Sequence, residues 1–304
     1  MLCGGVSLER EVSLNSGAEV KTALMEAGYD VVLEDVKSVS DIIKKWPEIG
    51  ADGAFIALHG GWGEDGRIQS ALESAGIPYT GSGPRSCMLS MDKETSRDIM
   101  SASGIPVPPG ISITPDERVD FAKLLDEWGK IVIKPASNGS TVGVVITSDE
   151  VAAKDAINTV WDIDTKAIVE RFIPGRELTV AVFGTGKDAF ALPVIEIRPN
   201  SGFYDYKSKY TKGATEYLCP APLDEDMTRV VTEYSRGAHE ALECGTYGRV
   251  DFRVSDDGAV YALEVNTAPG MTGTSLVPKA AKAHGWGFPE LLDRIVKDSF
   301  KRFR

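Results

Sequence analysis

Two segments near the C-terminal end of the chain constrain its fold most. Charged and apolar residues alternate over residues 249–254, and polar and apolar residues alternate again over residues 263–266. This period of two is typical of strands with one buried face. Asp257-Gly258 lies between the two segments and is a strong hairpin turn signal. The sequence therefore predicts an antiparallel hairpin with one apolar face and one charged face.

The polar face of this hairpin brings carboxylates together. If the turn is a two-residue loop, Asp251 pairs with Glu264, Arg249 pairs with Asn266, and Leu263 lies on the apolar face. Directly opposed carboxylates repel each other, and a divalent cation between them would remove the repulsion. Asp251, Glu264 and Asn266 form an all-oxygen donor set that suits Mg²⁺ or Mn²⁺ better than zinc.

A second interpretation of the same face needs no metal. Arg249 and Arg253 can neutralise the carboxylates as surface ion pairs, and a shift of the loop by one residue would place Glu264 opposite Arg249. Cross-strand pairs of opposite charge also stabilise a sheet. The hairpin residues alone leave both interpretations open.

Length and composition limit the classes of protein to which the chain can belong. A chain of 304 residues can bury a sizeable core, so we expect two or three domains. The formal net charge of −12 disfavours nucleic acid as the main partner. We expect no membrane span, because no apolar run approaches ~20 residues, and no signal peptide, because Met1 leads almost at once into polar residues. Four cysteines without metal-binding spacing fit a reducing cytoplasm.

Residues 1–84 alternate between strand and helix patterns. Strands are predicted at residues 1–5, 31–36 and 54–58, and helices at residues 11–27 and 68–75. This order indicates a small parallel α/β layer, in which ligands bind at the carboxyl ends of strands. The Gly4-Gly5 turn and the loop that begins at His59 occupy two of these ends.

The middle of the chain carries two lysines beside a loop of small residues. A helix is predicted at residues 92–103 with Lys93 in its first turn, and a strand at residues 131–135 contains Lys134. Residues 136–143 hold two glycines and three hydroxyl residues, and a return strand is expected at residues 142–146. Such a loop can close over phosphate, although an ordinary polar hairpin loop has the same composition.

The C-terminal half continues mainly in strands. Strands are predicted at residues 167–173, 177–183 and 190–197, a helix at residues 224–243, and a closing helical segment near residue 304. The polar and aromatic residues 203–212 follow no period, which is typical of a lid. The sequence contains no complete P-loop or dinucleotide-binding motif, so a phosphate site would need another scaffold.

Motifs spread over the whole chain agree in order and spacing with one family. They lie at residues 4–17, 59–60, 63–66, 78–83, 91–93, 134–135, 139–140, 142–143, 204–206, 209–210, 248–251, 264–272 and 275–278. Each motif is weak alone, but together they are highly specific. The sequence resembles the D-alanine–D-alanine ligases of the ATP-grasp superfamily over essentially its whole length.

The resemblance implies a fold and a division into domains. The expected class is α/β, with α+β character in the ATP-grasp part: a small parallel α/β N-terminal domain precedes a two-domain ATP-grasp fold. The implied domains are residues 1–84, which bind substrate, residues 85–175, the central ATP-grasp domain, and residues 176–304, the C-terminal ATP-grasp domain with the metal and substrate site. A homodimer is also implied.

The resemblance also implies an activity and an ATP site. Members of the family use ATP to join two D-alanines through an acyl phosphate, for peptidoglycan precursor synthesis. Two Mg²⁺ or Mn²⁺ ions would be held by Asp251, Glu264 and Asn266. The implied ATP-binding residues are Lys93 and Lys134 for the phosphates, Glu170, Ile173 and Glu177 for adenosine, and Lys209 for phosphate from the lid.

The resemblance assigns the remaining site residues to the two D-alanines. The first ammonium would be bound by Glu11 with help from His59, which also fits an ordinary loop histidine. The oxyanion of the tetrahedral intermediate would be stabilised by Arg249 and the Gly270 amide. The second carboxylate would be held by Ser275 and the Leu276 amide, and Tyr210 would close the lid against Ser140 and Glu11.

Two alternatives remain beside this activity. One is a sibling ligase that joins D-alanine to D-lactate or D-serine. Lys209-Tyr210 is the form that dipeptide-making relatives carry, so we expect D-alanine to be preferred over D-lactate. The other alternative is a non-catalytic ATP-grasp nucleotide-binding module, which predicts that a metal ligand or phosphate lysine is lost, whereas this sequence retains them all.

Overall fold

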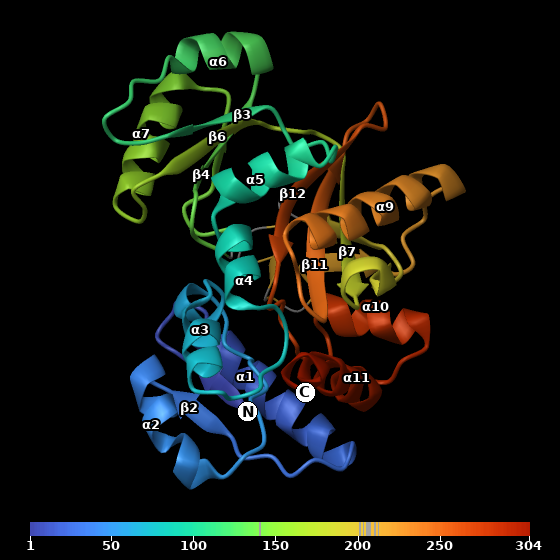
Figure 1. The fold of residues 1–304 in the computed structure, drawn as a ribbon. Coiled ribbons are helices and arrows are strands. Elements are labelled where there is room, and N and C mark those ends of the chain that lie inside the picture. The colour runs from blue at the N-terminus through green and yellow to red at the C-terminus, as the bar shows by residue number, and fades with distance from the viewer. Residues whose placement is uncertain (140, 201, 203, 205–207, 210, 212) are drawn as a thin grey trace.

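The computed structural model describes residues 1–139, 141–200, 202, 204, 208, 209, 211 and 213–304. Within these residues the strands form three sheets, and each sheet belongs to a different part of the chain. Figure 1 shows the N-terminal layer at one end of the molecule, with both termini beside it, and the other two sheets toward the opposite end.

The N-terminal layer is a parallel α/β arrangement. β1 (Leu2–Gly4) pairs in parallel with β2 (Glu34–Val36), and α1 (Arg10–Glu26), α2 (Val39–Ile49) and α3 (Arg67–Ser74) accompany them. Residues 54–58 are predicted to be a full strand, but they contribute only isolated bridges, from Ile56 to Leu2 and from Ala54 to Tyr79. Each neighbouring segment pairs with residues 54–58 through a single bridge, so no continuous ladder forms. α1 ends as predicted, because Gly28 takes up a φ of +91°.

The second sheet is antiparallel, with the strand order β3-β6-β4-β5. Its strands are β3 (Gly110–Ile113), β4 (Ile131–Pro135), β5 (Val145–Thr147) and β6 (Ala167–Arg171), with α6 (Phe121–Trp128) and α7 (Glu150–Trp161) packed beside them. The return strand starts at Val145 rather than at residue 142, because Thr141 and Gly143 have φ values of 63° and 73° that turn the chain.

A helical connection joins the first layer to this sheet. α4 (Pro84–Met91) is followed by α5 (Lys93–Ala102), and Asp92 separates them. The Asp92 carboxylate accepts a hydrogen bond from the Thr95 amide at 3.0 Å, which caps α5 at its N-terminus. This cap fixes where the helix that carries Lys93 begins.

The third sheet is the largest, with the strand order β10-β9-β7-β11-β12 and β8 paired to β7. Its strands are β7 (Arg176–Phe183), β8 (Phe190–Ala191), β9 (Ile195–Pro199), β10 (Thr215–Leu218), β11 (Tyr247–Val254) and β12 (Val260–Asn266), and α9 (Glu225–Ala241) packs on it. The single strand predicted at residues 190–197 is two strands, because Pro193 has no amide hydrogen to donate to a ladder.

The pairing at the polar end of the central hairpin is as predicted. Asp251 lies opposite Glu264, and Arg249 lies opposite Asn266. The alternative register, in which Glu264 lies opposite Arg249, is wrong. β11 also pairs with β7 along its whole length, so the charged face belongs to a sheet and not to an isolated ribbon.

The turn of this hairpin differs from the prediction. Strand pairing stops at Val254 and resumes at Val260, so the loop is longer than the predicted Asp257-Gly258. A β-bulge at Leu263 then adds one residue to β12 and restores the predicted register. Leu263 consequently lines a cavity instead of lying on the apolar face.

The C-terminal helices complete the N-terminal layer. α10 (Leu276–His284) leads to α11 (Phe288–Phe300), which packs against α1. Leu291, Leu292 and Ile295 of α11 share one buried cluster with Val20 and Leu24 of α1. The two ends of the chain therefore form one packed unit.

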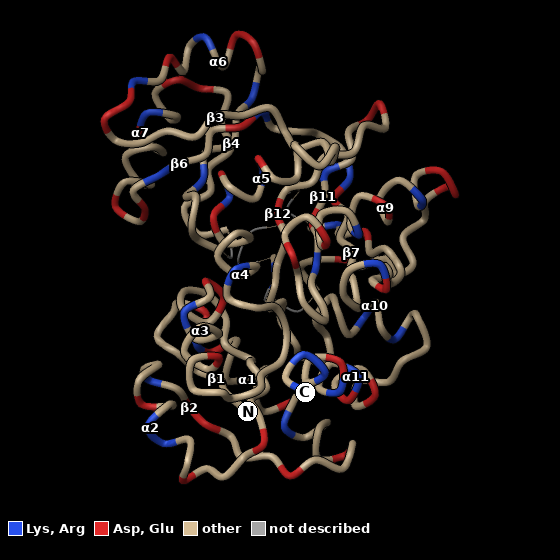
Figure 2. Tube along the Cα trace, in the orientation of Figure 1, with Lys and Arg blue, Asp and Glu red and all other residues tan. Residues whose placement is uncertain are grey.

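Charge is distributed over the whole molecule. Figure 2 shows Lys and Arg interspersed with Asp and Glu in every part of the trace, so the net charge of −12 is spread out. In the part of the chain that the structure describes, no helix has both the length and the apolar character that a membrane crossing requires.

Candidate active site

Two adjoining cavities lie between the layers. The smaller cavity, of about 280 Å³, is lined by the N-terminal layer and by the loop after β12. The larger cavity, of about 600 Å³, lies between the second and third sheets. Gly139, Tyr204, Lys209 and Glu264 line both cavities, which therefore meet at these residues.

Asp251 is the centre of a buried polar network on the third sheet. Arg249 donates to its two carboxylate oxygens at 2.8 and 2.7 Å, and Thr179 of β7 donates to Oδ1 at 2.6 Å. Asn266 donates its amide nitrogen to Oδ2 at 3.1 Å, which leaves its amide oxygen as a separate acceptor. Arg249 thus forms the ion pair that the interpretation without a metal predicts, but both side chains are only 14% exposed, so the pair is buried and does not lie on the surface.

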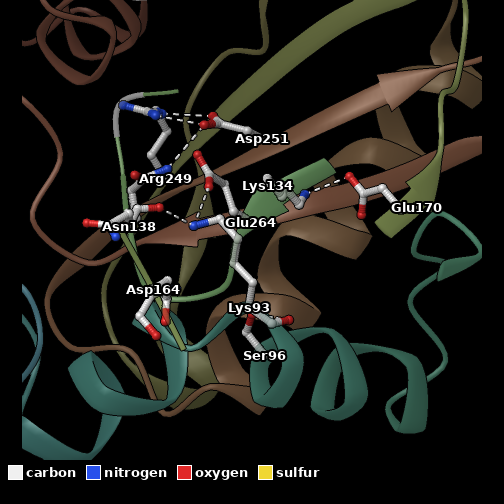
Figure 3. Close-up of polar contacts among 11 residues, drawn as sticks. Lys93, Ser96, Lys134, Asn138, Asp164, Glu170, Arg249, Asp251 and Glu264 are labelled. Atoms are coloured by element: carbon white, nitrogen blue, oxygen red, sulfur yellow. Dashed lines mark hydrogen bonds and ion pairs between the residues drawn. The ribbon is translucent and has the colours of Figure 1, made fainter. Parts of the chain in front are cut away.

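Glu264 is surrounded by cations. Lys93 Nζ lies 3.7 Å from Glu264 Oε2, as Figure 3 shows. Burial by itself raises the pKa of Glu264, but the charges of Lys93, Lys209, Lys134 and Arg249 together outweigh burial and hold the pKa at about 2. Glu264 is therefore an ionised carboxylate at the junction of the two cavities.

Both lysines predicted to bind phosphate are buried beside the larger cavity. Lys93 donates to the Asn138 carbonyl at 2.5 Å, and Lys134 of β4 donates to Glu170 Oε1 at 2.6 Å (Figure 3). Burial lowers the pKa of Lys93, although the neighbouring Glu264 opposes this effect. The two ammonium groups thus reach the same cavity from α5 and from β4.

Glu170 has more partners than the sequence indicates. It is 3% exposed, and Lys134 binds one carboxylate oxygen while Arg97 of α5 binds the other. Arg97 also donates to the Pro108 carbonyl at 2.7 Å. Because both Glu170 oxygens accept bonds from cations, its carboxylate holds Lys134 and Arg97 in place.

The far end of the larger cavity combines apolar and ionisable groups. Arg253 donates to the Ile173 carbonyl at 3.0 Å and to Glu177 Oε2 at 3.2 Å, and its guanidinium lies 5.5 Å from the Phe172 ring centroid. Burial outweighs the attraction of Arg253 and raises the pKa of Glu177 to about 7. Leu263, supplied by the β-bulge, lines the same cavity.

Glu9, and not Glu11, reaches the smaller cavity. Glu9 directly precedes α1 and lines the cavity together with Val12. Glu11 lies in the first turn of α1, is exposed and does not belong to the lining. Residues two apart at a helix start point in different directions. The structure therefore does not support Glu11 as the ammonium ligand, and Glu9 replaces it as the candidate.

His59 lines the smaller cavity with its ring fixed in place. The side chain is almost fully buried, with Nε2 3.1 Å from Ser16 Oγ and Nδ1 3.2 Å from the Ala268 carbonyl oxygen. Glu64 Oε1 lies 3.6 Å from Nδ1. These partners orient the imidazole, which an ordinary exposed loop histidine would not require.

The loop after β12 provides the other wall of the smaller cavity. Gly270, Ser275 and Leu276 all line it, as predicted for neighbours in the site. Ser275 precedes α10, and its Oγ accepts a hydrogen bond from the Thr272 amide at 3.0 Å. A Cβ atom on Gly270 would lie 3.3 Å from Ser275 Oγ, so a larger residue would crowd this hydroxyl.

Lys209 is one of the residues of the predicted lid, 203–212, that the structure describes. It lines both cavities, and its Nζ lies 5.2 Å from the Tyr204 ring centroid. Ser140 and Tyr210 fall outside the described residues, so their predicted contact across the substrate remains a prediction.

Several residues in or beside the cavities were not predicted from the sequence. Arg97 lies four residues after Lys93 on the same helix, a spacing that could have indicated a shared face. Phe172 directly precedes Ile173 and could have been included with it. Leu263 was not predictable as a cavity residue, because its position depends on a bulge that strand alternation does not reveal.

The fold and the site define a class of protein. Two antiparallel sheets enclose a cavity with buried lysines, and carboxylates of the larger sheet line it. This arrangement is the ATP-grasp fold of nucleotide-dependent ligases.

Comparisons of the sequence give the family. The profile of the D-ala D-ala ligase C-terminus matches residues 99–297, and the profile of the D-ala D-ala ligase N-terminus matches residues 35–82. The chain is 44% identical to the D-alanine–D-alanine ligase of Syntrophotalea carbinolica over 97% of this chain and 94% of the relative. It is 38% identical to the enzyme of that name from Clostridium beijerinckii over 99% and 98% of the two chains.

Solved structures agree with these sequence relatives. The D-alanine–D-alanine ligase of Bacillus anthracis in complex with ATP superposes with a TM-score of 0.87 at 36% identity, covering 99% of this chain and 97% of that one. The VanG D-Ala:D-Ser ligase of Enterococcus faecalis gives a TM-score of 0.80 at 28% identity, with 98% of each chain covered. The chain belongs to the D-alanine–D-alanine ligase family.

Proposed function

We propose that this chain uses ATP to join two molecules of D-alanine into D-alanyl-D-alanine, for peptidoglycan precursor synthesis. The observation that carries the proposal is the cluster of cations around Glu264, where a cavity of about 600 Å³ meets one of about 280 Å³. The larger volume suits a nucleotide and the smaller suits amino acids. A transferring phosphoryl group at the junction would meet concentrated positive charge.

The first proposed step forms an acyl phosphate. A carboxylate oxygen of the first D-alanine attacks the γ-phosphorus of ATP, and ADP leaves with the electrons of the broken P–O bond. Lys93, Lys134 and Lys209 neutralise phosphate charge during this transfer. Positioning and electrostatic stabilisation are the main sources of catalysis in phosphoryl transfer, so rigidly held ammonium groups are suited to it.

The second proposed step forms the peptide bond. The amine of the second D-alanine attacks the carbonyl carbon, a proton leaves the nitrogen, and inorganic phosphate departs. Arg249 and the Gly270 amide stabilise the tetrahedral oxyanion, Glu9 binds the first ammonium, and Ser275 with the Leu276 amide binds the second carboxylate. Arg249 donates to Asp251 through Nε and Nη2 only, so the N–H groups of Nη1 can face the oxyanion.

The polar face of β11 and β12 fits a divalent cation. Asp251, Glu264 and Asn266 supply only oxygen donors, Glu264 is ionised, and the Asn266 amide oxygen is not used toward Asp251. We propose that these three residues would hold two Mg²⁺ or Mn²⁺ ions. When bound, the ions would supply neutralisation of the phosphate charge.

A substitution at Asp251 tests the metal site. Asp251→Asn should lower kcat by on the order of 10²–10³ and raise the Mg²⁺ concentration needed for half-maximal rate, because one anionic ligand is lost. Phosphate release across a Mg²⁺ titration measures both quantities. Asp256→Asn in the exposed hairpin loop is the matched control, and near-normal turnover of Asp251→Asn would exclude the site.

Phosphate release combined with product chromatography tests the reaction itself. With Mg²⁺-ATP we expect release with D-alanine and not with L-alanine, and a rate that rises with pH to about 8 because the attacking amine must be neutral. The likeness to a D-Ala:D-Ser ligase makes a D-serine product the second candidate, and D-lactate should be a poor substrate. A chain that binds ATP without turnover on any of these acceptors would be a non-catalytic module.

Three broader expectations belong to this proposal. Residues 1–84, 85–175 and 176–304 would be the domains, because each sheet falls within one of these ranges, and α11 of the last would pack on α1 of the first. A cytoplasmic location is supported by cysteines that are all free thiols. A homodimer rests on the family resemblance, and light scattering of the purified protein would test it.

A further inference from the structure

The loop between β12 and α10 forms one wall of the smaller cavity but is held from outside it. Thr272, Thr274 and Ser275 line the cavity, whereas two charged residues that bind the loop do not. The loop receives the carboxylate of the second D-alanine under the proposed function, so the role of these two charged residues rests on that function. Gly273 lies inside the loop, and an exposed glycine leaves a backbone free to move unless other groups hold it.

The first of the two charged residues is Glu19. It lies on the third turn of α1, and its Oε2 accepts a hydrogen bond from the Gly273 amide at 2.6 Å. The two residues are 254 positions apart, so only the packing of the C-terminal part on α1 brings them together. Hydrogen bonds from an amide to an ionised carboxylate are stronger than neutral ones. Glu19 thus fixes the middle of the loop.

The second charged residue is Lys279. Its ammonium donates to the Thr274 carbonyl, and the same ammonium lies 5.2 Å from the centroid of the Tyr217 ring, which itself lines the cavity. Lys279 belongs to the first turns of α10, where the helix dipole disfavours a cation. Helix stability therefore does not account for a lysine here, whereas its contact with the loop does.

We infer that Glu19 and Lys279 are positioning residues for the second substrate. One holds an N–H and the other a C=O of adjacent loop residues, immediately before Ser275. Together they fix the backbone that presents the Ser275 hydroxyl and the Leu276 amide. A loop fixed in advance binds a carboxylate without the entropic cost of ordering itself. Removing either charge should weaken the binding of the second D-alanine. The binding of the first D-alanine, on the Glu9 side of the cavity, should not change.

Steady-state rates test the inference. Phosphate release is measured against D-alanine concentration at saturating Mg²⁺-ATP and fitted with separate half-saturation constants for the first and the second molecule. Lys279→Met and Glu19→Ala should each raise the second constant about tenfold, the worth of one charge-assisted hydrogen bond, with the first constant and kcat changed less than about threefold. Lys279→Arg should keep the wild-type constants.

Lys282→Met is the matched control, because it removes the same charge from an exposed position of the same helix. It should leave both constants unchanged. Equal rises in both constants, or a lower melting temperature without the split between them, would reduce Glu19 and Lys279 to general stabilising residues and overturn the inference. A wild-type protein without turnover on D-alanine would instead overturn the proposed function.

Discussion

At the scale of single residues, the surroundings of a carboxylate decide its charge. Glu264 and Glu177 line the same cavity, yet cations hold the pKa of Glu264 at about 2 and burial raises that of Glu177 to about 7. The difference lies in the number of neighbouring charges, since Glu177 faces chiefly Arg253. One carboxylate can thus serve as a permanent anion, while the other titrates near neutral pH.

The titration of Glu177 gives a prediction about stability. Its pKa in the folded protein lies above the ordinary value, so its contribution to stability is full at low pH and is lost as the pH rises through about 7. Glu177→Gln does not titrate, so its stability relative to wild type should increase between pH 5 and pH 8, by at most about 3 kcal/mol. Urea unfolding of both proteins at the two pH values measures this. A relative stability that is constant with pH would show that Glu177 ionises normally.

The assignment of the first ammonium to Glu9 instead of Glu11 gives a second prediction about single residues. Glu9→Gln should raise the half-saturation constant for the first D-alanine about tenfold or more, because an ammonium would lose its anionic partner. Glu11→Gln removes the same charge two residues away at an exposed position and should leave that constant unchanged. The measurement is phosphate release against D-alanine concentration. The reverse pattern would restore Glu11 as the ligand.

At the scale of elements, the bulge in β12 matters most for the site. Without an extra residue, the longer turn would bring Leu263 rather than Glu264 opposite Asp251. The bulge corrects this offset and adds an apolar side chain to the larger cavity. The single bulge therefore places Glu264 opposite Asp251 and also contributes an apolar side chain to the proposed nucleotide pocket.

Truncating the bulge residue tests its role in the pocket. Leu263→Ala should weaken ATP binding about fivefold, the effect of losing roughly 1 kcal/mol of apolar contact. The half-saturation constants for D-alanine should stay near wild type, because Leu263 does not line the smaller cavity. Calorimetric titration with ATP gives the affinity. An unchanged affinity would mean that the nucleotide does not contact Leu263.

At the scale of the whole molecule, the first and last parts of the chain share a core. α11 packs on α1, and the Tyr29 hydroxyl donates to Asp293 at 2.8 Å. This packing also brings Glu19 of α1 into contact with the Gly273 amide. The smaller cavity is consequently built from both ends of the chain, and its shape depends on how firmly they pack.

Leu292→Ala tests this shared core. Leu292 is fully buried, so its truncation should lower the free energy of unfolding by about 2–5 kcal/mol. Hydrogen exchange should become faster in α1 as well as in α11, because the two helices stabilise each other. Lys301→Ala at an exposed position is the control. Faster exchange confined to α11 would indicate that the N-terminal layer is stable alone.

The local elements and the residue types of the site could be predicted from the order of amino acids alone. Strand alternation predicted the two arms of the hairpin and the side chains that share its polar face, and the positions of Lys93 and Lys134 followed from a helix start and an apolar strand. These features depend on neighbours in the chain, so the pattern of residues is enough to reveal them. The motifs added the family and its reaction.

The packing of the layers determines which of two nearby residues faces a cavity and which charged side chains come into contact. Glu9 and Glu11 belong to the same motif, and the orientation of α1 distinguishes them. The partners of Glu170 and of Gly273 come from distant segments. Such contacts depend on how layers pack, and a bulge such as that at Leu263 shifts all later positions. The pattern of residues along the chain does not reveal such contacts or such a bulge, because both arise from interactions between segments far apart in the sequence.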